Sequence, residues 1–147
     1  MKLFSEIKWT LKNCIIFLDV DGTLVSEGGS ELSKESLNTF AKLRKNNLIF
    51  LCSNSPKKDR TKKLAKQLQV DWTKGTFKKP DERLLHELKI PKDKRKVVIG
   101  NLHCIDGRFA KNIGAQFFPV KTLVGKNEPY LNKLFYFMDR ILLSKCI

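Results

Sequence analysis

Short, continuous apolar runs recur along this chain, and segments with helical spacing separate them. A continuous run, rather than an alternating one, is typical of a strand buried on both faces of a parallel sheet. The four runs are "CIIFLDV" at 14–20, "LIFLCSN" at 48–54, "KVVIGN" at 96–101 and "AQFFPV" at 115–120. Their recurrence predicts parallel strands joined by helical crossovers.

The segments between these runs carry apolar residues three and four positions apart, as amphipathic helices do. The residues with this spacing are Leu37, Phe40, Ala41 and Leu43, then Leu64, Ala65 and Leu68, then Leu84, Leu85 and Leu88, then Ile105, Phe109 and Ile113. Ser33 is a suitable N-cap for the first helix. With a short strand before the third helix and a C-terminal amphipathic helix at about 128–144, we expect a three-layer α/β/α sandwich on an open parallel sheet of about five strands.

Length and composition fit one globular domain. The chain has 147 residues, of which 41% are hydrophobic and 30% charged, which excludes a disordered protein. It contains no internal repeat, low-complexity tract or linker, so residues 1–147 are predicted to form a single domain. The apolar runs are too short to span a bilayer, and the N-terminus lacks the apolar stretch of a signal peptide.

The cysteines indicate a reducing environment. Cys14, Cys52, Cys104 and Cys146 are widely separated and form no C-x-x-C pair, so neither a zinc site nor a disulfide framework is indicated. We expect the cytoplasm or another reducing compartment, with peripheral attachment to a membrane as an option.

The positive charge of the chain is concentrated in its middle third. The formal net charge is +14, and residues 51–100 contain 15 basic and 6 acidic residues. Such an excess predicts an anionic partner, which is a phosphorylated substrate, a membrane surface or nucleic acid. A solvated lysine-rich surface is the alternative, above all for the basic helix expected at 57–68. Nucleic acid ranks lower because no aromatic-rich motif accompanies the charge.

Polar side chains follow the first strand at the point where it ends, in "FLDVDGTLV". Asp19 and Asp21 are two positions apart, so both point to the same side as the chain leaves the sheet. Gly22 permits a tight turn, and the Thr23 hydroxyl can hydrogen-bond back to the loop. Two carboxylates this close repel each other unless a cation lies between them, and Mg²⁺ with a substrate phosphate is the natural candidate. An Asx-rich turn that only ends a strand is the alternative.

Three later segments place polar groups at the same edge of the predicted sheet, where ligands of open parallel sheets bind. The second run ends on Ser53 and Asn54, whose hydroxyl and backbone amides suit phosphate oxygens. Lys79 precedes a proline that holds its backbone extended, which suits a fixed positive charge. In "VVIGNLHCID", Asn101 and Asp106 are further oxygen ligands.

These residues resemble, in order, the four motifs of the haloacid dehalogenase (HAD) superfamily of phosphatases: "DVDGT", Ser53, Lys79 and "GNLHCID". The resemblance covers almost the whole chain and implies a Rossmann-like fold. Only 29 residues separate Thr23 from Ser53, and 25 separate Ser53 from Lys79, which leaves no room for the cap domain of many members. A capless site is open to large or membrane-borne substrates, or is closed by formation of a homo-oligomer.

The resemblance implies a role for each site residue. Asp19 is the nucleophile that forms an aspartyl-phosphate, and Asp21 protonates the leaving oxygen and then activates water. Lys79 offsets the phosphoryl charge and holds Asp19 in place. The implied substrate-binding residues are Ser53, Asn54 and Thr23.

Mg²⁺ is the implied cofactor, held by the Asp19 carboxylate, the Asp21 backbone carbonyl and the fourth motif, where Asp106 steadies the shell from a second position. The family usually has aspartate where this chain has Asn101. An amide oxygen ligates a hard cation but removes one negative charge. Three interpretations follow: a working enzyme with weaker metal affinity, an inactive relative that only binds, or an engineered substitution that traps a complex.

Within the superfamily, the chain is most similar to the compact class III A group that includes phosphatidylglycerophosphate phosphatases. The "SNS" after the second strand, the "KKP" before the third helix and the short fourth motif carry this similarity. It implies an anionic phospholipid substrate at a membrane surface. The alternatives are a small soluble phosphate ester, such as a sugar or nucleotide phosphate, and an impaired HAD domain that binds anionic lipid or nucleic acid.

The C-terminal helix carries a broad apolar stripe of Leu131, Leu134, Phe135, Met138, Ile141 and Leu142. Such a stripe predicts packing against the sheet. Insertion at a membrane interface, aided by Lys133, Arg140 and Lys145, is the alternative, with the N-terminal "LFSEIKW" as a second candidate segment.

Overall fold

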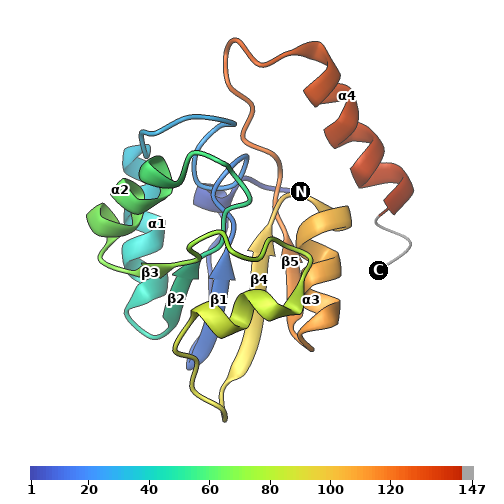
Figure 1. Cartoon of the computed structure of the whole chain (residues 1–147). Coiled ribbons are helices and arrows are strands. Elements are labelled where there is room, and N and C mark those ends of the chain that lie inside the picture. The colour runs from blue at the N-terminus through green and yellow to red at the C-terminus, as the bar shows by residue number, and fades with distance from the viewer. Residues whose placement is uncertain (144–147) are drawn as a thin grey trace.

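The computed structural model describes residues 1–143, and a five-stranded sheet lies at its centre (Figure 1). The strand order is β3-β2-β1-β4-β5, and every neighbouring pair is parallel. The strands are β1 (Cys14–Leu18), β2 (Leu48–Leu51), β3 (Asp71–Trp72), β4 (Arg95–Gly100) and β5 (Gln116–Pro119). The predicted open parallel sheet is therefore confirmed, and the first apolar run forms its central strand.

Helices follow the strands in the predicted order. The α-helices are α1 (Lys34–Arg44), α2 (Lys58–Leu68), α3 (Arg108–Asn112) and α4 (Tyr130–Met138). Short 3₁₀-helices lie at Phe4–Glu6 and Glu82–Glu87, and π-helical turns at His103–Gly107 and Asp139–Leu143. Ser33 caps α1, and its hydroxyl accepts a hydrogen bond from the Ser36 N–H at 3.1 Å. Residue 144 of the expected C-terminal helix, Lys145 and Cys146 lie outside the described residues.

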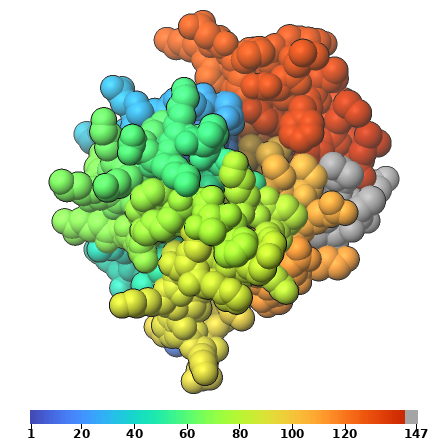
Figure 2. Space-filling view, viewed as in Figure 1, coloured from blue at the N-terminus to red at the C-terminus, as the bar shows by residue number. Residues whose placement is uncertain are grey.

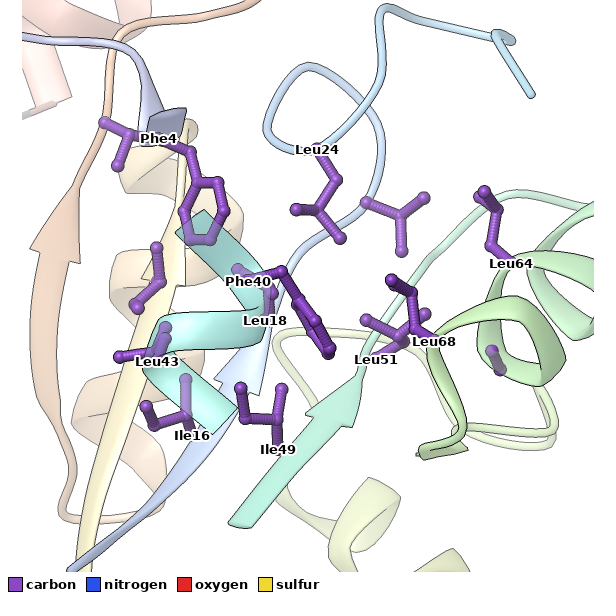
Figure 3. Close-up of a cluster of buried hydrophobic side chains, with 14 of the residues drawn as sticks. Phe4, Ile16, Leu18, Leu24, Phe40, Leu43, Ile49, Leu51, Leu64 and Leu68 are labelled. Carbon is purple, nitrogen blue, oxygen red and sulfur yellow. The ribbon is translucent and has the colours of Figure 1, made fainter. Parts of the chain in front are cut away.

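The side chains of β1 alternate between two buried layers, which is why the whole run is apolar. Ile16 and Leu18 pack with residues of α1 and α2 on one face of the sheet (Figure 3). Ile15 and Phe17 pack on the other face with the Glu82–Glu87 helix and α3. The α/β/α sandwich is thus present, and residues 24–52 and 54–78 form only the helices and strands of this sandwich with their connections.

The third predicted helix is a 3₁₀-helix rather than an α-helix. The Asp81 carboxylate caps its start by accepting from the Arg83 N–H at 2.9 Å. Because the residue before a proline is disfavoured in the α region, Pro91 limits how far the helix can extend. Leu84 and Leu88 are nevertheless buried and Leu85 is half-buried, so the segment packs on the sheet as a helix and only the helix type differs.

The N-terminal segment belongs to the core. Phe4 is 1% exposed, and its ring lies 5.8 Å from that of Trp9. "LFSEIKW" therefore packs on the sheet through Phe4, in contrast to the prediction of a membrane-inserting segment.

The C-terminal helix α4 does not pack against the sheet, so that prediction is wrong. Figure 1 shows α4 outside both helical layers, beyond the edge strand β5. None of its residues is buried, and Leu131 is 75% exposed. The physical reason is that α1 and α2 already cover one face of the sheet, while the Glu82–Glu87 helix and α3 cover the other.

Substitution of Phe17 tests this assignment of the core. Phe17 is fully buried and packs on the rings of Phe50 and Phe109, at 6.1 Å and 5.8 Å. We expect Phe17→Ala to lower the free energy of unfolding in urea by about 3–5 kcal/mol. The matched substitution Leu131→Ala on α4 should change it by less than about 0.5 kcal/mol. A large effect of Leu131→Ala would contradict the exposed position of α4.

Candidate active site

The predicted site residues meet at the carboxyl ends of β1, β2 and β4. A cavity of about 230 Å³ lies there, and its lining includes Asp19, Asp21, Asn54, Lys79, Asn101 and Asp106. Ser53 and Thr23 contribute through hydrogen bonds to the two aspartates that line the cavity. The structure thus brings together all the residues that the sequence patterns singled out.

Lys79 is the central group of this site. Its ammonium Nζ lies 2.7 Å from Asp19 Oδ1 and 2.5 Å from Asp106 Oδ1, and its side chain is 2% exposed. Burial by itself lowers the pKa of Lys79, but the charges of Asp106 and Asp19 raise it well above its ordinary value. The lysine therefore remains charged and bridges the carboxylates that follow β1 and β4.

Asp19 is a buried carboxyl group with a strongly altered proton affinity. Burial and, next, the nearby Asp106 charge raise the pKa of Asp19 to about 7, although Lys79 and Thr23 act in the opposite direction. Its second oxygen, Oδ2, accepts a hydrogen bond from the Thr23 hydroxyl at 2.8 Å. Both oxygens thus have fixed donors, which orients the carboxylate toward the cavity.

Asp21 is held by a separate set of donors. The Ser53 hydroxyl donates to Asp21 Oδ2 at 3.1 Å, and the Gly28 N–H donates to Oδ1 at 3.1 Å. Arg60 Nη2 lies 2.6 Å and 2.7 Å from the two oxygens of this carboxylate. Asp19 and Asp21 therefore line one cavity, but each has its own cation.

Arg60 is the site residue that the sequence patterns did not single out. It lies on α2 within the basic stretch 57–68, whose Lys58, Lys62, Lys63 and Lys66 are exposed as expected. The Arg60 side chain is only 9% exposed, and its Nη1 donates to the Gly29 carbonyl at 2.5 Å. The signal in the sequence is its spacing on the helix. Residue 60 lies four positions before the buried Leu64 and therefore on the same side of α2.

Asn54 lines the cavity, and its side-chain amide also binds the backbone of Lys79. Its Nδ2 donates to the Lys79 carbonyl at 2.8 Å, and the Lys79 N–H donates to Asn54 Oδ1 at 2.9 Å. The peptide bond from Lys79 to Pro80 is cis. The segment before Pro80 is therefore attached to the end of β2 by two hydrogen bonds.

Two glycines allow the loops to approach closely. Gly22 has φ +75°, and a Cβ at this position would lie 2.5 Å from Asn101 Nδ2. A Cβ at Gly100 would lie 2.3 Å from the Asp106 carboxyl carbon. Neither position tolerates a side chain, because the loops after β1 and β4 occupy that space.

The oxygen donors at this edge suit a hard divalent cation. Asp19 Oδ2 and Asn101 Oδ1 approach the same Thr23 hydroxyl, at 2.8 Å and 3.4 Å, so two of the predicted ligand oxygens converge. Both Asp106 oxygens accept hydrogen bonds, from Lys79 and from the Leu102 N–H, which fits a supporting position. Within residues 1–143, no three histidine, cysteine or acidic side chains cluster as a metal site.

A Mg²⁺ ion would therefore depend on Asn101, a backbone carbonyl and substrate or water oxygens in addition to Asp19. Mg²⁺ is bound in this way in many phosphate sites, through one or two carboxylates plus substrate phosphates. The donor set present here fits that ion.

A second cavity adjoins the first through Asn101. Its volume is about 300 Å³, and it lies between α4 and the segment that follows β5. Lys121, Lys133 and Arg140 line it together with the aromatic side chains Tyr136 and Phe137. We call this cavity the α4 groove.

A family model described as haloacid dehalogenase-like hydrolase matches residues 16–132. The chain belongs to this family. The match runs from Ile16 within β1 to beyond β5 and includes all eight predicted site residues, and it agrees with the resemblance found in the motifs. Searches of curated proteins and of solved structures found no match. Membership in a hydrolase family, together with the cavity above, supports hydrolase chemistry at this edge of the sheet.

The altered pKa of Asp19 predicts a pH dependence of stability. The pKa is about 7 in the folded protein against the ordinary 3.8, so the folded state binds this proton more tightly than the unfolded state does. Between those pH values, the Asp19 contribution to the free energy of unfolding should fall as the pH rises. This contribution is measured by urea unfolding of the wild type and of Asp19→Asn at several pH values, without divalent cations. Parallel pH curves for the two proteins would contradict the assignment.

Proposed function

We propose that this protein is a Mg²⁺-dependent phosphomonoesterase that acts through an aspartyl-phosphate on Asp19. The observation that carries the proposal is the arrangement of two carboxylates in one cavity, each oriented by its own cation. Lys79 holds Asp19, and Arg60 holds Asp21. The cavity of about 230 Å³ is small, which suits a phosphoryl group.

In the proposed reaction, an Asp19 oxygen attacks the phosphorus atom and the bond from phosphorus to the ester oxygen breaks. Asp21 gives a proton to that leaving oxygen. Asp21 then takes a proton from water, which attacks the phosphorus of the aspartyl-phosphate, so that inorganic phosphate leaves and Asp19 is restored. Lys79 offsets the charge on the phosphoryl oxygens throughout.

The ligands proposed for Mg²⁺ are the Asp19 carboxylate, the Asp21 carbonyl and the Asn101 amide oxygen, with Asp106 in support. When bound, the ion neutralises charge on the phosphoryl group and positions it. The Asn101 amide oxygen can take the ligand role, since it accepts one long hydrogen bond, 3.4 Å from the Thr23 hydroxyl, and has a second lone pair.

Phosphatidylglycerophosphate is the proposed substrate. A lipid phosphate has an anionic headgroup beside apolar chains, and the α4 groove offers both cationic and aromatic side chains next to the catalytic cavity. A small soluble ester would use the catalytic cavity alone. Nothing in that cavity requires a lipid, so the choice rests on the groove.

The proposed reaction predicts turnover that depends on Mg²⁺ and on the residue at position 101. We expect Mg²⁺-dependent phosphate release from phosphatidylglycerophosphate, with Asp19→Asn as the inactive blank. Asn101→Asp should lower the Mg²⁺ concentration needed for half-maximal rate, because it adds one negative charge to the ion's ligands. The neighbouring Thr122 hydroxyl, which accepts from the Asn101 amide, can turn and donate to the new carboxylate, so the fold should accept it.

Asn38→Asp, at an exposed position on α1, is the matched control for the added charge. Turnover of only soluble phosphate esters in the same assay would replace the lipid substrate. No turnover by this chain or by Asn101→Asp would contradict the proposed phosphatase activity.

Turnover should also depend on Arg60. Removing the cation that orients Asp21 should lower kcat/KM by about ten- to a hundredfold, a part of the 10²–10⁴ that a positioned acid–base group contributes. We expect this loss in Arg60→Gln and a partial return in Arg60→Lys, which keeps the charge but loses the planar guanidinium that contacts both Asp21 oxygens and the Gly29 carbonyl. Arg83→Gln, on the surface, is the control. Equal rates for Arg60→Gln and Arg83→Gln would exclude a role for Arg60.

A further inference from the structure

In a helix of a domain core the apolar side faces inward, but in α4 it faces outward. Its apolar stripe faces away from the rest of the molecule, and the exposed fractions are 75% for Leu131, 41% for Leu134, 45% for Phe135, 47% for Met138 and 49% for Ile141 in the following turn. In the space-filling view, this C-terminal segment forms a ridge on the outside of the molecule (Figure 2). Monomeric proteins rarely expose an apolar surface of this kind without a partner.

The side of α4 that faces the domain is held by polar contacts. The Tyr136 hydroxyl donates to the Glu128 carboxylate. After the helix, the buried Asp139 carboxylate accepts from the N–H groups of His103 at 2.7 Å and Cys104 at 2.9 Å. Burial acts to raise the pKa of Asp139, but these hydrogen bonds hold it below its ordinary value. The outward direction of the stripe is therefore fixed by contacts with the fourth-motif loop.

Exposed cations lie on and near α4, and three of them line the α4 groove behind the stripe. Lys121, Lys126, Lys133 and Arg140 are exposed, and no carboxylate of residues 1–143 forms an ion pair with any of them. The acidic residues between positions 121 and 143, Glu128 and Asp139, are engaged by the hydrogen bonds described above. The part of the molecule that carries the stripe is thus positively charged behind its apolar face.

This charge decides between two occupants of the stripe. A second copy would bring the same cations and the same net charge of +14, so electrostatic repulsion opposes self-association. An anionic lipid surface complements both the apolar stripe and the cations.

We propose that α4 docks this protein on anionic phospholipid membranes. The apolar stripe enters the interface, and the exposed cations behind it attract the anionic headgroups, each nearby cation contributing about 1 kcal/mol. The helix lies on the membrane and does not cross it, since no helix in residues 1–143 is long and apolar enough to span a bilayer. The docking is independent of the proposed phosphatase activity.

Docking through α4 would also position the active site. The α4 groove lies on the inner side of the helix and shares Asn101 with the catalytic cavity. The helix and the groove beneath it therefore lie between the membrane and the opening that leads to Asp19.

Co-sedimentation of the full chain with vesicles tests this proposal. We expect binding to vesicles of phosphatidylcholine mixed with phosphatidylglycerol, weakening as salt is added, and much weaker binding to phosphatidylcholine alone. The double variant Leu131→Gln/Phe135→Gln should lose at least about tenfold in affinity, since two large apolar side chains no longer enter the interface. Leu48→Gln, at a 36% exposed leucine at the start of strand β2, is the matched control.

Equal binding by the wild type and the double variant would overturn the proposal. A dimer of the wild type in light scattering that the double variant reduces to a monomer would overturn it as well, because the stripe would then join two copies. Hydrolysis of p-nitrophenyl phosphate separates docking from catalysis, and the double variant should retain the wild-type rate because neither side chain lines a cavity. Vesicle binding without any phosphatase activity would support the docking and overturn only the proposed function.

Discussion

The site depends on one buried ammonium group between two buried carboxylates. Lys79, Asp19 and Asp106 are each at most 7% exposed, so each charge has lost most of its water. Such charges are tolerated only while they remain paired, and removal of one partner from a buried pair typically costs about 3–5 kcal/mol. The lysine therefore connects the ends of β1 and β4 to the segment after β3, and the cavity has its shape because these three segments meet there.

Around this pairing, the loops are arranged by close backbone approach and by hydrogen bonds. Gly22 and Gly100 leave room for Asn101 and Asp106, and Thr23 links Asp19 to Asn101. As a result, the two aspartates of one small cavity pair with different cations, Asp19 with Lys79 and Asp21 with Arg60. These separate pairings allow the two neighbouring carboxylates to serve different steps of a phosphoryl transfer, as we propose.

Helix α4 connects the site to the surface of the molecule. Asp139 attaches the end of the helix to the loop that carries Asn101 and Asp106, so the orientation of α4 and the geometry of the fourth motif depend on the same backbone amides. The groove between them brings cationic and aromatic side chains next to the catalytic cavity. An exposed apolar stripe that is attached to an active-site loop suits the membrane docking that we propose.

The sequence by itself determined the parallel sheet, its buried positions and the edge at which Asp19, Asp21, Ser53 and Lys79 meet, because strand burial and residue spacing are local properties of the chain. It could not separate Arg60 from the lysines around it, since which cation turns inward depends on Asp21 and Gly29, which belong to a distant loop. It also showed the stripe of α4 but not its direction. Only the tertiary structure decided that direction, because both faces of the sheet were already covered and the contacts of Asp139 join residues far apart in the chain.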